Sequence, residues 1–96
     1  MSRGEMLTVF SYDVSSDKRR RKIARLLEDA ATRVQYSVFE TRMSRARAEA
    51  LCQRLAAHLG EGDSLRLYVI GHDGEQRSRV FGDGAPFESD EGYWLF

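Results

Sequence analysis

Two short strand patterns, each followed directly by the apolar stripe of a helix, fill most of the first 60 residues of this chain. Residues 6–12 combine β-branched, aromatic and aliphatic side chains, which favours a largely buried strand. The next segment, about residues 17–31, places Ile23, Leu26 and Leu27 on one face of a helix. A strand that leads into an amphipathic helix predicts a sheet with that helix packed on one of its faces.

The second strand pattern spans residues 33–41 and has two different faces. Val34, Tyr36 and Val38 alternate on the side predicted to be apolar, and Phe39 falls on the other, mostly polar side. A second helix pattern follows this strand, so the change from the two-residue period of a strand to the roughly 3.6-residue period of a helix occurs a second time.

Ser44 is positioned to cap the second helix, and Gly60 is expected to end it in a left-handed turn. A third strand is predicted over residues 63–70. The apolar stripe of the second helix comprises Ala48, Leu51, Cys52, Leu55 and Leu59.

The remainder of the chain contains shorter signals. A turn is predicted at residues 71–74 and a short fourth strand at residues 79–81. Residues 93–96 are four consecutive apolar side chains, which we expect to pair with a sheet edge in the same chain or in a partner. Spacing alone therefore predicts the order βαβαββ.

Length and charge restrict what the chain can be. Its 96 residues predict a single domain over residues 1–96, with residues 1–5 as a flexible extension. The net charge of zero hides a division, because residues 1–60 carry 12 basic and 7 acidic side chains whereas residues 61–96 carry 3 and 8. The basic part is suited to a phosphate-bearing partner, and the acidic part to solubility or a basic partner.

Cys52 is the only cysteine, so no disulfide forms within the chain, and its spacing predicts a core position. The histidines at positions 58 and 72 are expected at the surface without a catalytic role. Neither a secretory leader nor an apolar stretch long enough to cross a bilayer is apparent, which predicts a cytoplasmic protein.

Asp13 ends the first strand, and the densest basic run of the chain, residues 18–22, begins five residues later. A strand-end carboxylate can bind a hard divalent metal, and a basic helix start can bind phosphate. Asp13 is also suited to an ordinary turn before Ser15 and Ser16, which residue types alone favour, and the basic run is equally suited to a solvated helix face. Residue types alone leave both interpretations open.

Four segments carry a resemblance to a known family: Tyr12-Asp13, Lys18-Arg19-Arg20, the stretch Arg33-Val34-Gln35-Tyr36-Ser37-Val38-Phe39-Glu40, and the strand that begins at Asp63. Together they strongly resemble Cas2, the small CRISPR-associated subunit of the adaptation machinery. The resemblance covers about residues 6–70.

The resemblance implies an α+β fold, a ferredoxin-like βαββαβ sandwich with an extra C-terminal strand, assembled as a homodimer. Residues 93–96 would then form an edge strand on the partner protomer. This order replaces the one counted from spacing, and it requires the second strand pattern to divide into two. We expect the division within residues 37–43.

The resemblance also implies nucleic-acid binding and spacer acquisition together with the integrase subunit, with possible cleavage of RNA or DNA that depends on a divalent metal, Mg²⁺. Asp13 matches the metal-binding aspartate, shared across the dimer. The matching catalytic set is Asp13, Tyr12, Arg20, Arg33, Ser37 and Phe39. The set expected to bind nucleic acid is Lys18, Arg19, Arg20, Arg21, Lys22, Arg25 and Arg33.

Two alternatives remain beside a nuclease. A single carboxylate per protomer, with no evident general base, also suits a non-catalytic DNA-binding scaffold of the integration complex. A ligand-sensing ferredoxin-like dimer is disfavoured, because it leaves the basic helix start without a purpose.

Overall fold

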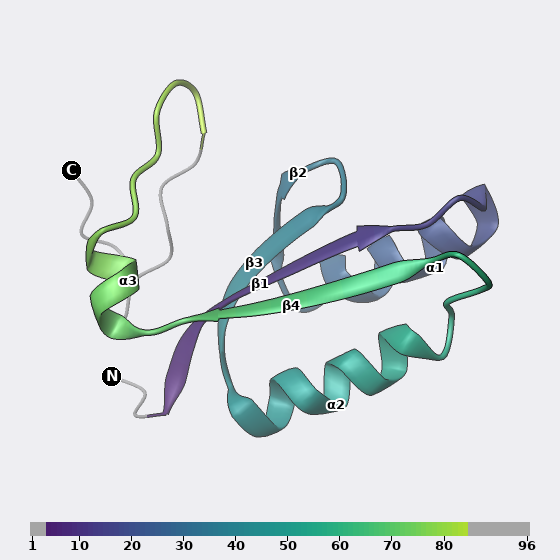
Figure 1. The fold of residues 1–96 in the computed structure, drawn as a ribbon, viewed down its shortest axis with the longest axis horizontal. Helices are drawn as coiled ribbons and strands as arrows, with labels where there is room; N and C mark the ends of the chain where they lie inside the picture. The colour runs from purple at the N-terminus through teal and green to yellow at the C-terminus, as the bar shows by residue number, and fades with distance from the viewer. Residues whose placement is uncertain (1–3, 85–96) are drawn as a thin grey trace.

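The computed structural model describes residues 4–84, which form four strands and three helices (Figure 1). In chain order these are β1 (Glu5–Asp13), α1 (Asp17–Glu28), β2 (Thr32–Gln35), β3 (Val38–Ser44), α2 (Arg45–Ala56), β4 (Ser64–Ile70) and α3 (His72–Gln76). The first six elements follow the order βαββαβ. The ferredoxin-like α+β fold implied by the resemblance is therefore confirmed, and the order βαβαββ counted from spacing is wrong.

The strands form one antiparallel sheet in the order β2-β3-β1-β4. The first strand is central, and its Phe10 lies between Phe39 of β3 and Leu67 of β4. Within residues 4–84, β2 and β4 are the two edges of the sheet. The two βαβ units interlock, so that strands distant in sequence become neighbours.

A tight turn at Tyr36 and Ser37 divides the second strand pattern into β2 and β3. Gln35 pairs with Val38 across this turn, and the register shifts between Arg33 and Gln35. The division thus falls at the start of the predicted range, and the rest of that range is an unbroken strand.

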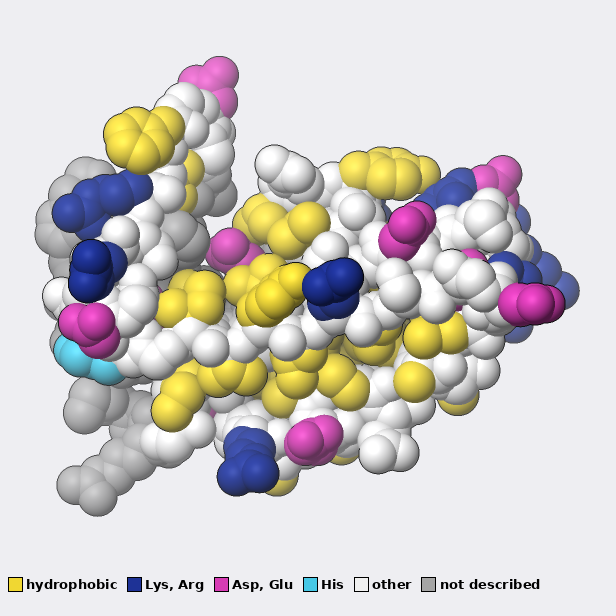
Figure 2. Space-filling view, viewed as in Figure 1, with side chains coloured by type: hydrophobic (Ala, Val, Ile, Leu, Met, Phe, Trp, Pro, Cys, Tyr) yellow, Lys and Arg dark blue, Asp and Glu magenta, His cyan; other side chains and the backbone are white. Residues whose placement is uncertain are grey.

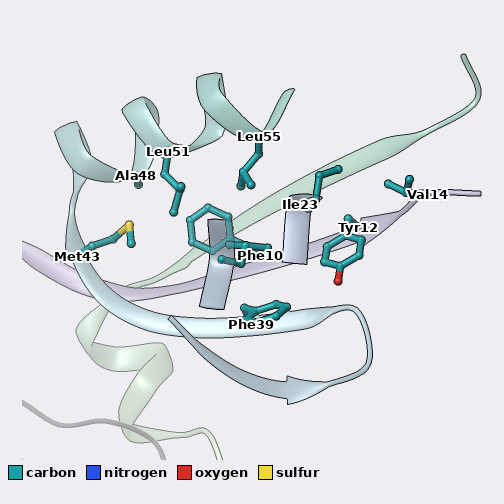
Figure 3. Packing of buried hydrophobic residues seen from close by; sticks show 10 residues of the cluster. Phe10, Tyr12, Val14, Ile23, Phe39, Met43, Ala48, Leu51 and Leu55 are labelled. Atoms are coloured by element: carbon teal, nitrogen blue, oxygen red, sulfur yellow. The ribbon is translucent and has the colours of Figure 1, made fainter. Parts of the chain in front are cut away.

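The core lies between the sheet and the helices α1 and α2 (Figure 3). From the sheet, Phe10 and Phe39 point into it, and from the helices, Ile23 and Leu55 meet them, all four with no exposed surface. Cys52 is partly buried against this cluster, as its spacing predicts. Because side chains alternate along a strand, the other side of the sheet, which we call the outer face, carries the odd-numbered residues of β1.

The faces predicted for the second strand pattern are wrong. Phe39, assigned to the polar side, is fully buried, whereas Val34 and Tyr36, assigned to the apolar side, are 38% and 69% exposed. The turn and the register shift reset the alternation, so a single phase cannot describe both strands.

Serine caps begin both long helices. The Ser16 hydroxyl accepts a hydrogen bond from the Arg19 N–H at 3.2 Å, and the Ser44 hydroxyl accepts one from the Arg47 N–H at 3.2 Å. Both helices end a few residues earlier than predicted, at Glu28 and Ala56.

Gly60 does not adopt the expected left-handed turn, since the positive φ angle in that loop belongs to Gly62. A side chain at Gly60 would instead displace the Arg19 guanidinium, because a Cβ atom at this position would lie 2.6 Å from the Arg19 Cζ. Glycine at position 60 therefore leaves the room that Arg19 occupies.

The segment after β4 differs from its prediction. The helix α3 replaces the turn predicted at residues 71–74, and Glu75 on it forms an ion pair with Arg42 of β3. The strand predicted at residues 79–81 does not form, because no strand of the described chain lies beside it and Phe81 is 88% exposed. The predicted edge strand at 93–96 lies outside the described residues.

Between residues 4 and 84, no helix combines the length and apolar character required to cross a membrane.

Candidate nucleic-acid interface

Two predicted site residues at the end of β1, Tyr12 and Asp13, lie on opposite faces of the sheet. Tyr12 belongs to the helix-side core and is 5% exposed. Asp13 follows it, pairs with Ser64 of β4 and is exposed on the outer face. Two neighbours in sequence therefore act in different surroundings.

Tyr12 is held in place by the β2–β3 turn. Its ring stacks on Phe39 with centroids 6.4 Å apart, and its backbone N–H donates to the Ser37 carbonyl at 3.1 Å. The Tyr12 hydroxyl donates to the Tyr36 carbonyl at 3.5 Å. Burial raises the pKa of the Tyr12 phenol, and the nearby Arg33 offsets this only in part, so the hydroxyl stays protonated at neutral pH.

Arg33 reaches the same turn from β2. Its guanidinium lies 4.9 Å from the centroid of Phe39 and 6.0 Å from that of Tyr36, and it donates to the Tyr36 carbonyl at 3.0 Å. A second nitrogen donates to the Glu28 carboxylate at 3.3 Å. Arg33 thus connects the end of α1 to the turn through both charge and ring contacts.

Arg20 approaches the turn from α1. Its guanidinium lies 5.9 Å from the Tyr36 ring centroid, donates to the Val14 carbonyl at 2.8 Å and pairs with Asp17. Desolvation lowers the pKa of Arg20, but interactions with Tyr36 and Asp17 outweigh it and raise the pKa overall, so its charge is fixed. We call Arg20, Arg33 and Tyr36 the arginine–tyrosine cluster.

The structure therefore divides the predicted catalytic set. Tyr12, Arg20, Arg33, Ser37 and Phe39 gather around the β2–β3 turn. Asp13 lies apart from them, because its side chain projects from the outer face whereas Tyr12 and Phe39 are in the core on the helix side. Sequence reasoning did not assign a role to Tyr36, although it is the most exposed member of the arginine–tyrosine cluster.

The basic run at the start of α1 also divides. We use the name basic stripe for Lys18, Arg21, Lys22 and Arg25, which are spaced to share one side of the helix and are all exposed. Within residues 4–84 none of these four side chains forms an ion pair. Figure 2 shows basic side chains gathered at the α1 end of the molecule.

Arg19 has a structural partner that sequence reasoning missed. Its Nε donates to the Asp63 carboxylate at 2.8 Å, and this carboxylate also accepts the N–H groups of Gly60 at 2.8 Å and Ser15 at 3.2 Å. The Asp63 side chain is 1% exposed, and these hydrogen bonds, with that of Arg19 first, lower its pKa to about 2. Arg19 therefore ties α1 to the start of β4, which leaves it poorly placed to bind a ligand.

The outer face combines apolar and charged side chains. Val9 of β1 pairs with Glu40 and with Tyr68, which is 49% exposed, and Ser11 pairs with Val38 and Arg66. Figure 2 shows hydrophobic side chains along the edge strand β4. In the described part of the chain, no three His, Cys, Asp or Glu side chains, Asp13 included, converge into a group that could hold a metal ion.

A four-stranded antiparallel sheet with α1 and α2 packed on one of its faces defines a small ferredoxin-like α+β protein. The family profile of CRISPR associated protein Cas2 matches residues 6–78, and the chain belongs to that family.

Known proteins support the assignment along most of the chain. A Synechocystis protein named CRISPR-associated endoribonuclease Cas2 3 is 47% identical over 68 residues, which cover 69% of this chain and 74% of that protein. The crystal structure of Streptococcus pyogenes Cas2 at pH 6.5 superposes with a TM-score of 0.67 and 34% identity, covering 80% of this chain and all of that one. A chain of a partial Cas6-RT-Cas1–Cas2 complex gives a TM-score of 0.72 and 27% identity, covering 95% of this chain and 99% of that one.

Proposed function

We propose that this protein is a nucleic-acid-binding subunit of a CRISPR adaptation complex, which acts as a homodimer beside an integrase subunit. The observation that carries the proposal is the basic stripe on α1, four exposed cations without an ion pair among residues 4–84. The similarity to a chain of a complex that also contains Cas1 supports the integrase partner. A cytoplasmic location remains a prediction.

The basic stripe is suited to a polyphosphate backbone. Its positions 18, 21, 22 and 25 follow one side of the helix over about 10 Å, given a rise of about 1.5 Å per residue. Cations without protein partners gain most from releasing the counterions of a duplex, and they read no sequence. Of the predicted nucleic-acid set, these four are therefore the primary contacts, whereas Arg19 is engaged by Asp63.

The outer face is the surface that we assign to the homodimer. Val9, Val38 and Tyr68 supply apolar area on it, and Glu40 and Arg66 supply charges of opposite sign. A symmetric pair uses the same patch twice, so each acidic group can meet a basic group of the partner. Such pairing would bring Asp13 of both protomers to one interface.

The fit of Mg²⁺ depends on that pairing. One exposed carboxylate per chain is too few, because Mg²⁺ prefers six oxygen ligands, but two carboxylates with water and a substrate phosphate match its usual protein sites. The two Asp13 side chains would hold the ion, which when bound activates water and polarises a phosphoryl oxygen.

Within this function, the subunit would also cleave RNA or DNA. The Synechocystis relative is named an endoribonuclease, which supports it. Within one protomer, however, Arg20 and Arg33 stand on the helix side with Tyr36, and the raised pKa of Tyr12 makes its phenol unsuited to serve as a base. These observations favour the second candidate, a scaffold that binds the duplex without cutting it.

The Asp13→Ala variant decides between the two candidates. The wild type, the variant and an Asp83→Ala control, which also removes an exposed carboxylate, are compared for Mg²⁺-dependent cleavage of RNA and duplex DNA and for duplex binding. A nuclease loses cleavage only in Asp13→Ala and keeps its binding. Absence of cleavage in the wild type, or cleavage that survives the substitution, leaves the scaffold as the function.

A further inference from the structure

Tyr36 is exposed, whereas the two aromatic residues packed near it are buried. It follows β2 at the tip of the β2–β3 hairpin with 69% of its surface exposed, whereas the rings of Tyr12 and Phe39 beside it are 5% and 0% exposed. A large aromatic side chain left in water has no part in the core, and it gains from covering its ring with a flat apolar partner.

The backbone of this hairpin is fixed from three sides. The Tyr36 carbonyl accepts hydrogen bonds from the Arg33 guanidinium at 3.0 Å and the Tyr12 hydroxyl at 3.5 Å, and the Ser37 carbonyl accepts the Tyr12 N–H at 3.1 Å. A ring mounted on a fixed turn loses little conformational entropy when a ligand covers it. The turn is thus prepared for binding before a ligand arrives.

The charges around the ring indicate the chemistry of the ligand. The guanidinium carbons of Arg20 and Arg33 lie 5.9 and 6.0 Å from its centroid. Their carboxylate partners Asp17 and Glu28 are 74% and 56% exposed, so these ion pairs are weak and a phosphate can compete for the same guanidinium groups. A flat ring beside two cations matches a nucleotide, which joins a planar base to a phosphate.

We propose that Tyr36 is a stacking platform for one unpaired nucleobase, with Arg20 and Arg33 beside it to receive the adjoining phosphate. The platform rests on the proposed nucleic-acid function and extends it, because a base within a duplex is already stacked on both faces and cannot cover the ring. Aromatic side chains on a basic surface are the usual means of binding single strands without sequence preference. The ligand is therefore a strand with an unpaired base, such as a duplex with a single-stranded end.

The experiment compares two DNA probes, a blunt duplex and the same duplex with a short unpaired end that carries 2-aminopurine. We expect the wild type to bind the second probe more tightly and to quench its fluorescence by stacking. Replacement Tyr36→Leu keeps an apolar side chain without a ring, and it should weaken binding of the second probe by roughly 5- to 150-fold while blunt-duplex binding stays unchanged. Tyr36→Phe keeps the ring and should restore the preference.

Phe81→Leu is the matched control, because Phe81 is an aromatic side chain with 88% of its surface exposed and Arg79 close in sequence. It should leave both probes unaffected. Equal binding of the unpaired end by the wild type and Tyr36→Leu, while both still bind the blunt duplex, overturns the platform alone. Failure of the wild type to bind either probe overturns the proposed function and the platform with it.

Discussion

The basic stripe on α1 yields a quantitative prediction for salt dependence. Each phosphate neutralised on duplex DNA contributes about −0.9 to the slope of log K against log salt. If the four side chains of the stripe each contact one phosphate, one protomer contributes about −3.6, and its affinity falls about 150-fold between 50 and 200 mM salt. The double replacement Arg21→Ala and Arg25→Ala should reduce this contribution to about −1.8, a fall of about 12-fold.

The assay is duplex binding by fluorescence anisotropy at a series of salt concentrations. The double replacement Arg47→Ala and Arg54→Ala on α2 is the matched control, since it removes the same charge from exposed positions that are also on one side of a helix. We expect the control to keep the wild-type slope and only slightly lower the affinity through the general field of the protein.

Two results would refute this reasoning. An unchanged slope in Arg21→Ala with Arg25→Ala means that the stripe does not contact phosphate. An equal reduction in the α2 control means that net charge, and not the position of the stripe, determines binding.

The buried contacts give two further predictions. Because the pKa of Asp63 is lowered from 3.8 to about 2 in the folded protein, its contribution to stability is complete above about pH 4 and is lost as the pH falls towards 2. The stability difference between wild type and Asp63→Asn, measured by urea unfolding, should therefore shrink over that range, and a difference that stays constant from pH 6 to 2 contradicts the assignment. Phe39→Ala removes a fully buried ring and should lower the free energy of unfolding by about 3–5 kcal/mol. Any loss of activity in this variant should therefore accompany a loss of folded protein. A variant that keeps wild-type stability but lacks activity would instead show that Phe39 takes part directly in the reaction.

The course of the chain up to β4 was largely predictable from local patterns. The strand that ends at Asp13 and the two long helices form where the apolar period indicates, and Ser44 caps the second helix as predicted. The resemblance supplied the correct order of elements, including the division of the second strand pattern. The individual strand and helices depend on residues close together in sequence and can be read from it, whereas the order of the elements could not be read from spacing.

The wrong predictions, by contrast, concern features that depend on strand pairing. The exposure of Val34 and Tyr36 and the burial of Phe39 follow from a two-residue turn and a register shift, which change the phase of the alternation by a small local rearrangement. The strand predicted at residues 79–81 has a suitable composition but lacks a partner strand in the described chain, and a strand is stable only within a sheet.

The candidate site shows the same limit. The sequence alone determined that a strand-end carboxylate, a basic helix start and an Arg33-to-Phe39 segment are present. Only the tertiary structure decided that Asp13 faces away from Arg20 and Arg33. It also decided that Arg19 forms an ion pair with Asp63, 44 positions away in sequence, and that Tyr36 is an exposed ring near both Arg20 and Arg33. The physical reason is that spacing fixes which neighbours share a face, whereas contacts between distant segments depend on sheet register and helix packing, which only the whole fold sets.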